Sequence, residues 1–318
     1  MQMIDVNEGK LVDDSPKNQG SGFNLDPWFK FFLIAIASMV LLAMLAIFIE
    51  LIRSSALSLK TFGLSFLFES TWDPVKEEFG ALPFIFGTLA SSLIAMMIAV
   101  PVSLGVSLFV TQWAPAWLRN PISFLVELLA AIPSVIYGLW GIFVLVPFIR
   151  TEIFPVVYKT LGFIPIFEGP AYGPSLLAGG LILSIMILPT ITSISKEIFS
   201  TVPTEYKEAV FALGGTRWES IRWVVLKYAK SGVIGACVLG LGRALGETMA
   251  VTMVIGNRPE VPHSLFAPAY SLASVIANEF SEATSELYLS SLSKMGLILL
   301  LVTFIVNGFA RLLVRKVK

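Results

Sequence analysis

The chain has 318 residues, of which 56% are hydrophobic and only 14% are charged, and its mean hydropathy is +0.81. This composition leaves too little polar surface for a soluble globule, so we expect an all-α protein that crosses a membrane several times. The 22 basic and 22 acidic residues cancel. This balance argues against nucleic acid as a partner, because a phosphate backbone recruits a basic excess.

The N-terminal region, residues 1–27, has acidic residues, glycine and proline among few apolar side chains, and we expect a mobile cytoplasmic tail. It lacks the basic start and the cleavage site of a signal peptide, so the apolar run that follows, residues 28–52, is expected to be a retained first span. Residues 28–80 are then expected to form one part of the chain, made of this span and a mixed periplasmic loop.

Residues 81–318 are expected to form a five-helix membrane core. Its spans are predicted over residues 83–111, 122–148, 174–195, 231–255 and 295–313, because each stretch is long and apolar enough to cross a bilayer. Pro101 predicts a kink in the first of these five. A loop rich in proline and glycine is expected over 150–173, and a polar loop over 257–289 with a short surface helix at 271–280.

The basic residues outside the spans predict the orientation. Most of them fall on one side when the N-terminal tail, the loop after the second span, the segment 203–230 and the C-terminus are placed together. By the positive-inside rule that side is the cytoplasm. We therefore expect a multi-pass membrane protein, surrounded by lipid, with both termini cytoplasmic.

The segment 203–230 is polar and charged, and it leads directly into the predicted fifth span. Pro203 and Glu205 are typical of the start of a helix, and Gly214-Gly215 predicts its end. Thr216 and Glu219 have the spacing of a capping box that begins a second helix. Glu205, Lys207 and Glu208 leave little continuous apolar face, so we favour a docking surface for a soluble motor over an amphipathic interfacial helix.

Arg243 and Glu247 are the charged residues of the predicted fifth span. A charge at membrane depth costs at least ~2.5 kcal/mol on insertion scales, so both residues require a partner or a cavity. Their spacing of four predicts one helix face, where they either neutralise each other or line a polar pathway in which Arg243 meets an anion and Glu247 holds it in place. We favour the pathway. Gly240, Gly242 and Gly246 nearby favour close helix contact.

Other reactive residues give weaker signals. Cys237 is expected to be a small buried residue, and His263 has no cysteine or histidine companion, so no metal site is predicted. Glu127 is interpreted as structural before functional.

No nucleophile, base and metal constellation indicates an enzyme, and no cofactor is expected. No P-loop is present, so any ATP must be bound by another subunit.

Two runs of residues resemble a known family. Glu208-Ala209-Val210, Gly214 and Val224-Val225-Leu226 are similar to the EAA motif of bacterial ABC-importer permeases, although Val210 and Lys227 depart from its usual alanine and proline. The runs 242–257 and 127–141 resemble the phosphate-specific permeases of the PstC type.

The resemblance implies a MetI-like permease fold with six transmembrane helices and a cytoplasmic coupling helix. It implies that the chain forms half of the pathway of an ATP-driven phosphate importer, which works by alternating access. The implied partners are a homologous PstA-type permease, two PstB-type ATPase subunits and a periplasmic phosphate-binding protein. Arg243 and Glu247 match the family's phosphate-passage residues. Five residues match or adjoin its contact with the ATPase: Glu205, Glu208, Ala209, Gly214 and Gly215.

Three alternatives stay open at this point. The first is the same architecture with another oxyanion, sulfate or molybdate, as substrate. The second is an ion-coupled secondary transporter, which would need no ATPase and predicts inverted repeats with broken helices that the sequence does not reveal. The third is a membrane scaffold, which would leave Arg243 and Glu247 without an explanation.

Overall fold

The computed structural model describes residues 26–168 and 172–316, with side chains described over 28–168 and 172–312. The chain divides into two compact units, residues 1–48 and 49–318. The predicted N-terminal tail lies outside the described residues, except that a helix already begins at Asp26. Within the described residues six helices are long and apolar enough to cross a membrane.

The first unit contains most of helix α1, Asp26–Ser54, and the segment from Trp28 to Ser54 includes an 18-residue stretch with a mean hydropathy of 3.0. Such a run crosses a hydrocarbon core of about 30 Å. The expected first span, residues 28–52, is therefore confirmed as a helix.

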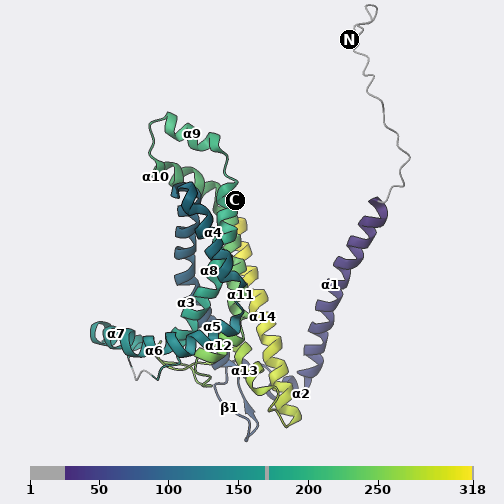
Figure 1. The fold of residues 1–318 in the computed structure, drawn as a ribbon. Coiled ribbons are helices and arrows are strands. Elements are labelled where there is room, and N and C mark those ends of the chain that lie inside the picture. The colour runs from purple at the N-terminus through teal and green to yellow at the C-terminus, as the bar shows by residue number, and fades with distance from the viewer. Residues whose placement is uncertain (1–25, 169–171, 317–318) are drawn as a thin grey trace, which may run out of the picture. The chain divides into compact units, whose positions relative to one another are not determined.

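The second unit contains the other elements (Figure 1). Its helices are α2 Ala56–Phe62, α3 Leu82–Leu108, α4 Ala116–Ala131, α5 Ser134–Trp140, α6 Val146–Phe148, α7 Phe154–Leu161, α8 Leu176–Ser200, α9 Thr204–Ala212, α10 Arg217–Ser220, α11 Leu226–Leu245, α12 Met249–Val254, α13 Leu272–Glu279 and α14 Glu286–Lys316. Short 3₁₀ or π-helical turns cover Ser65–Leu67, Phe109–Trp113, Gly141–Leu145, Ile149–Ile153, Pro165–Phe167 and Ile221–Val225. Strands β1, Trp72–Asp73, and β2, Glu78–Phe79, form an antiparallel hairpin.

The centre of the second unit is the pair α3 and α8, which pack along most of their length. Helix α11 packs against α8, α3 and α14, while α4 packs against α8 and α5 against α12. Buried side chains such as Leu183, Ile187 and Ile191 from α8 fill the space between these helices. In Figure 1, α9 and the C-terminal end of α14 lie toward one end of the unit, and β1 and α13 lie at the other.

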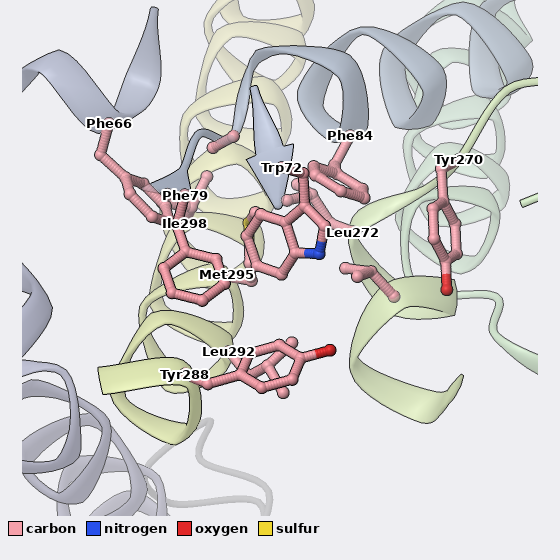
Figure 2. Close-up of a cluster of buried hydrophobic side chains, with 12 residues drawn as sticks. Phe66, Trp72, Phe79, Phe84, Tyr270, Leu272, Tyr288, Leu292, Met295 and Ile298 are labelled. Carbon is pink, nitrogen blue, oxygen red and sulfur yellow. The ribbon is translucent and has the colours of Figure 1, made fainter. Parts of the chain in front are cut away.

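An aromatic cluster holds the end of the unit opposite α9, and Figure 2 shows its members facing one another. The Trp72 ring lies 4.9 Å from the Phe79 ring and 5.0 Å from the Phe84 ring, both edge-on. The Trp72 indole and the Tyr288 hydroxyl both donate to Glu279 Oε2, at 2.8 and 2.6 Å. These bonds tie the hairpin to α13 and α14.

Lys294 of α14 joins this end of the molecule to α2. Its side chain is buried, with 3% exposed, and its Nζ donates to the carbonyl oxygens of Ser58 and Gly63 at 3.2 and 3.0 Å. The ammonium also lies 4.1 Å from the centre of the Phe66 ring. Ser290 Oγ accepts from the Ser58 backbone at 3.0 Å. We call this set the Ser58–Lys294 clasp.

Three predictions about the spans and the loop 150–173 need correction. The predicted third span, residues 122–148, is not continuous, because the chain is extended at Ile132 and Pro133 between α4 and α5, and proline disfavours helical geometry in the residue before it. The spanning helix assigned here is Ser134–Leu161, so helix also replaces much of the loop expected over 150–173. The predicted fifth span ends early: α10 and α11 form one helix, Arg217–Leu245, and the chain breaks before α12.

The short helix expected over 271–280 exists as α13, but it is not a surface helix. Its first turn is buried, from Leu272 to Val275, and Ser271 caps it by accepting from the Ser274 backbone at 3.1 Å. The isolated sequence could show the helix but not the aromatic cluster that covers it.

Candidate functional site

Arg243 lies in the last turn of α11, at the break in the fifth spanning helix. Its Nη1 donates to the hydroxyl of Thr190 on α8 at 3.1 Å, and the side chain is exposed. Among the described residues no carboxylate lies within 4.0 Å of its guanidinium. One hydrogen bond therefore holds the Arg243 guanidinium in place, and its other N–H donors stay available for a ligand.

Glu247 lies outside the helix that holds Arg243, so the expectation that the two residues share one helix face is wrong. Among the described residues no ion pair joins them, which also removes the alternative that they neutralise each other. Gly246 ends α11, and Glu247 lies in the break before α12. Its Oε1 accepts from the backbone N–H of Ala250 at 3.4 Å. A carboxylate at this position stabilises the positive end of α12, so Glu247 shapes the break that follows Arg243.

Close packing of α11 against α8 and α14 fixes the position of Arg243 relative to these helices. A Cβ on Gly240 would lie 2.6 Å from Ile191 Cγ1 of α8, and one on Gly242 would lie 3.4 Å from Asn307 Nδ2 of α14. The expected use of glycine for close helix contact is thus confirmed at Gly240. Gly246 differs, because the nearest atom to a Cβ added there would be the Gly242 carbonyl oxygen, at 3.7 Å. This glycine lies at the end of α11.

Helix α5 closes the other side of the break. A Cβ on Gly138 would lie 2.5 Å from Met253 Sδ and 3.2 Å from the Ala250 Cα of α12, so α5 and α12 approach closely at this glycine. The Tyr137 hydroxyl donates to the Leu129 carbonyl at 2.8 Å, which meets a backbone acceptor that the end of α4 leaves free. Helix α5 thus packs closely against α12 beside the break.

Thr190 is the site residue that sequence reasoning missed. It lies inside an apolar helix directly after Pro189 and has no charge or motif to mark it. Proline removes a backbone donor from the helix. Only the packing of α8 against α11 reveals that its hydroxyl meets Arg243.

The segment 203–230 forms the two helices and the turn that its sequence predicts. Helix α9 follows Pro203, and the chain turns at Gly214, where φ is +83°. Thr216 Oγ1 accepts from the Glu219 backbone at 3.3 Å, while Glu219 Oε2 accepts from the Thr216 backbone at 2.7 Å. The predicted capping box is confirmed.

The residues assigned to the ATPase contact lie together on this segment. Glu205, Glu208, Ala209 and Gly214 are exposed, and Gly215 is half-buried. A groove of about 540 Å³ runs between α9 and the start of the next helix, with Tyr206, Leu213 and Trp223 among its lining residues. The Trp218 ring stacks on Trp113 at 6.3 Å, which connects this segment to the end of the α3 span.

Glu127 also has a partner that sequence reasoning missed. Its Oε1 lies 3.9 Å from Lys196 Nζ on α8. His263 lines a separate pocket of about 230 Å³ with Arg258 and Glu260, at the end opposite α9. Within 26–168 and 172–316 no three histidine, cysteine, aspartate or glutamate side chains gather as metal ligands.

The sequence comparisons point to one family. Residues 102–318 match the family described as binding-protein-dependent transport system inner membrane component. The phosphate transport system permease protein PstC of Mesorhizobium japonicum is 49% identical over 287 residues, which cover 89% of this chain and 88% of that protein. PstC of Haemophilus influenzae is 46% identical over 290 residues, which cover 90% of this chain and 91% of that protein.

Two solved structures resemble the fold. An inward-facing methionine ABC transporter, MetNI, matches 74% of this chain and 94% of its own with a TM-score of 0.54 and 18% identity. A bacterial ABC transporter that imports alginate matches 92% of this chain and 97% of its own with a TM-score of 0.60 and 16% identity. At these identities the likeness concerns the fold alone.

Proposed function

Since this chain belongs to the binding-protein-dependent inner membrane permeases, and within them to the PstC type, we propose that its site at Arg243 passes inorganic phosphate. The chain is a permease subunit of an ABC phosphate importer, with a MetI-like all-α fold. It is a transport subunit and not an enzyme. It is a multi-pass membrane protein that works with an ATPase and a periplasmic binding protein.

The observation that carries the proposal is the state of Arg243. Its guanidinium is held by Thr190, is exposed, and has no carboxylate within 4.0 Å among the described residues. Guanidinium binds phosphate through two parallel N–H donors, so a fixed and uncompensated arginine is suited to meet that anion. Glu247 acts beside it by holding the break between α11 and α12.

The assembly follows from the same family. We propose a homologous PstA-type permease as the other half of the pathway, and two PstB-type ATPase subunits on the cytoplasmic side. Helix α9, with Glu208 exposed, inserts into the ATPase. Both termini then lie on the cytoplasmic side of a bacterial inner membrane. This orientation agrees with the excess of basic residues near α9. The division into 1–27, 28–80 and 81–318, with a coupling segment 203–230, stays a proposal.

Alternating access couples these parts. Closure of the ATPase moves α9, and the continuous helix α10–α11 carries that movement to Arg243, because its 29 residues join the segment to the break. The stacked Trp113 and Trp218 give a second connection, to α3. Arg243 thus faces first one side of the membrane and then the other.

The alternatives are less well supported. The break in α11–α12 is of the kind that secondary transporters use, but the family is ATP-driven. Sulfate and molybdate are disfavoured because the relatives reported above are named for phosphate. A scaffold would leave a held, uncompensated arginine without a role.

The test is phosphate uptake into proteoliposomes that contain the full complex, with binding protein outside and ATP inside. We expect ATP-dependent uptake that Arg243→Gln abolishes and Arg243→Lys retains in part, because lysine keeps the charge but not the planar fork. Excess sulfate or molybdate should not compete. Uptake without ATP, or a fully active Arg243→Gln complex, would contradict the proposal.

A further inference from the structure

Glu127 and Lys196 form the one ion pair that joins two helices within the described parts of the chain. Glu127 lies on α4 and Lys196 on α8, whereas the other two pairs, at 73–76 and 258–260, are local contacts in loops. Glu127 lies one turn from the C-terminal end of α4, which is the negative end of a helix, so its charge is not placed there to stabilise α4.

The pair is loose and open. Its atoms are 3.9 Å apart, which is longer than a hydrogen bond, and the Glu127 side chain is 67% exposed while that of Lys196 is 29% exposed. Exposed ion pairs of this kind contribute little to stability. Charged side chains that are exposed along membrane helices face a cavity or a partner instead of lipid.

Hydroxyl groups gather at the same place. Thr192 and Ser193 of α8 line a space of only about 10 Å³ together with Glu127 and Lys196. Thr192 is 2% exposed, and its Oγ1 has no hydrogen-bond partner among the described residues. A buried hydroxyl without a partner is costly, and here it is a donor available next to an ammonium group.

The position of Lys196 relates it to Arg243. Thr190, which holds Arg243, lies six residues before Lys196 on the same helix, or roughly 9 Å along its axis. Helix α8 continues from Thr190 past Lys196 toward α9. An ion that leaves Arg243 toward the α9 end therefore moves toward Lys196, and conduction requires several weak sites instead of one tight site.

We infer that Lys196 is a second anion contact on the cytoplasmic side of Arg243, and that Glu127 is the resident carboxylate which phosphate displaces from it. The space beside the pair is too small for phosphate, so α4 must move away from α8 for the anion to lodge. The return of Glu127 to Lys196 then expels the anion and resets the site. This inference rests on the proposed function.

The experiment uses the full complex in proteoliposomes with internal ATP and measures inhibition of initial radiolabelled phosphate uptake by phosphate inside. Lys196→Gln removes the contact, so we expect the inhibition constant of internal phosphate to rise by about threefold or more, the scale of one partly exposed charge pair. Glu127→Gln removes the competitor, so the constant should fall by a similar factor. Lys196→Arg should behave like the native complex.

A structural role for the pair predicts a different result, because losing either partner would then lower assembly and uptake in parallel and leave the inhibition constant unchanged. That result would overturn the inference. Lys30→Gln, which removes one basic residue from the other compact unit, is the matched control and should change nothing. A native complex without ATP-dependent uptake would instead refute the proposed function, and the inference with it.

Discussion

Thr190 and Arg243 are joined across two helices, with Nη1 of Arg243 donating to the Thr190 hydroxyl at 3.1 Å. The residues are 53 positions apart in the sequence. The bond fixes one edge of the guanidinium on α8 and directs the rest of the group away from that helix. The orientation of the arginine therefore depends on a neutral residue of another span.

Thr190→Val is expected to weaken phosphate passage without weakening the protein. Valine has nearly the same shape but no acceptor, so Arg243 loses its fixed orientation. A hydrogen bond to a charged group contributes ~1.5 kcal/mol or more, so we expect uptake at low phosphate to fall by about tenfold. Thr190→Ser keeps the acceptor and should stay near the native rate. Native uptake by Thr190→Val would show that the bond does not position Arg243.

Gly240→Ala is expected to destabilise the permease. The new Cβ would lie 2.6 Å from Ile191 Cγ1, so the buried Ile191 side chain or α11 itself must shift, and overpacking of this kind costs ~1–3 kcal/mol. Gly235 of the same helix has no atom within 4 Å of its Cβ position, which makes Gly235→Ala the matched control. Thermal unfolding of the purified complex in detergent should show a lower Tm for Gly240→Ala only. Equal Tm values would mean that α8 and α11 separate easily.

Glu279→Ala is expected to loosen the hairpin at the end opposite α9. The substitution removes the acceptor for both the Trp72 indole and the Tyr288 hydroxyl, and each unpaired donor costs ~1–3 kcal/mol. Limited proteolysis should then cut within residues 74–77 more quickly. Glu282→Ala, at an exposed neighbour, should be cut at the native rate. Protection equal to the native chain would show that the aromatic packing alone holds the hairpin.

Glu208→Ala is expected to weaken association with the ATPase and to leave the permease itself intact. Glu208 is exposed, and surface substitutions usually change stability by less than about 0.5 kcal/mol. Copurification of the ATPase and phosphate-stimulated ATP hydrolysis would measure the effect. Glu152→Ala, at an exposed glutamate outside the coupling segment, is the control. Unchanged copurification and stimulation would remove Glu208 from the coupling contact.

Local signals made part of this structure predictable. Apolar length gave the first, second, fourth and sixth spans, and the Thr216–Glu219 spacing gave the capping box, since each depends on neighbours in the sequence. Proline and glycine marked the two ends of α9 for the same reason.

The breaks in the spans were not predictable in this way. Gly246 is one of three glycines, with Gly240 and Gly242, and the residues around it do not show that the helix ends there and not at the other two. Gly246 itself is exposed, and a Cβ there would meet only the carbonyl oxygen of Gly242 in its own helix, at 3.7 Å. The helix beyond the break, α12, packs against Gly138 of α5, and sequence spacing does not reveal this tertiary contact. The same limit applies to the partners of the charged side chains. Arg243 contacts Thr190 and Glu127 contacts Lys196, and in each case the partner lies on another helix, so sequence spacing does not predict the contact.

The Ser58–Lys294 clasp has a consequence for the order in which the protein is made. Ser58 meets Ser290 and Lys294 across 232 and 236 positions of the sequence. During synthesis α2 emerges early, and its partners in α14 follow only when most of the chain has left the ribosome, so this joint is among the last to close. A chain that stops before residue 290 therefore leaves α2 without the side chains that pair with the Ser58 backbone.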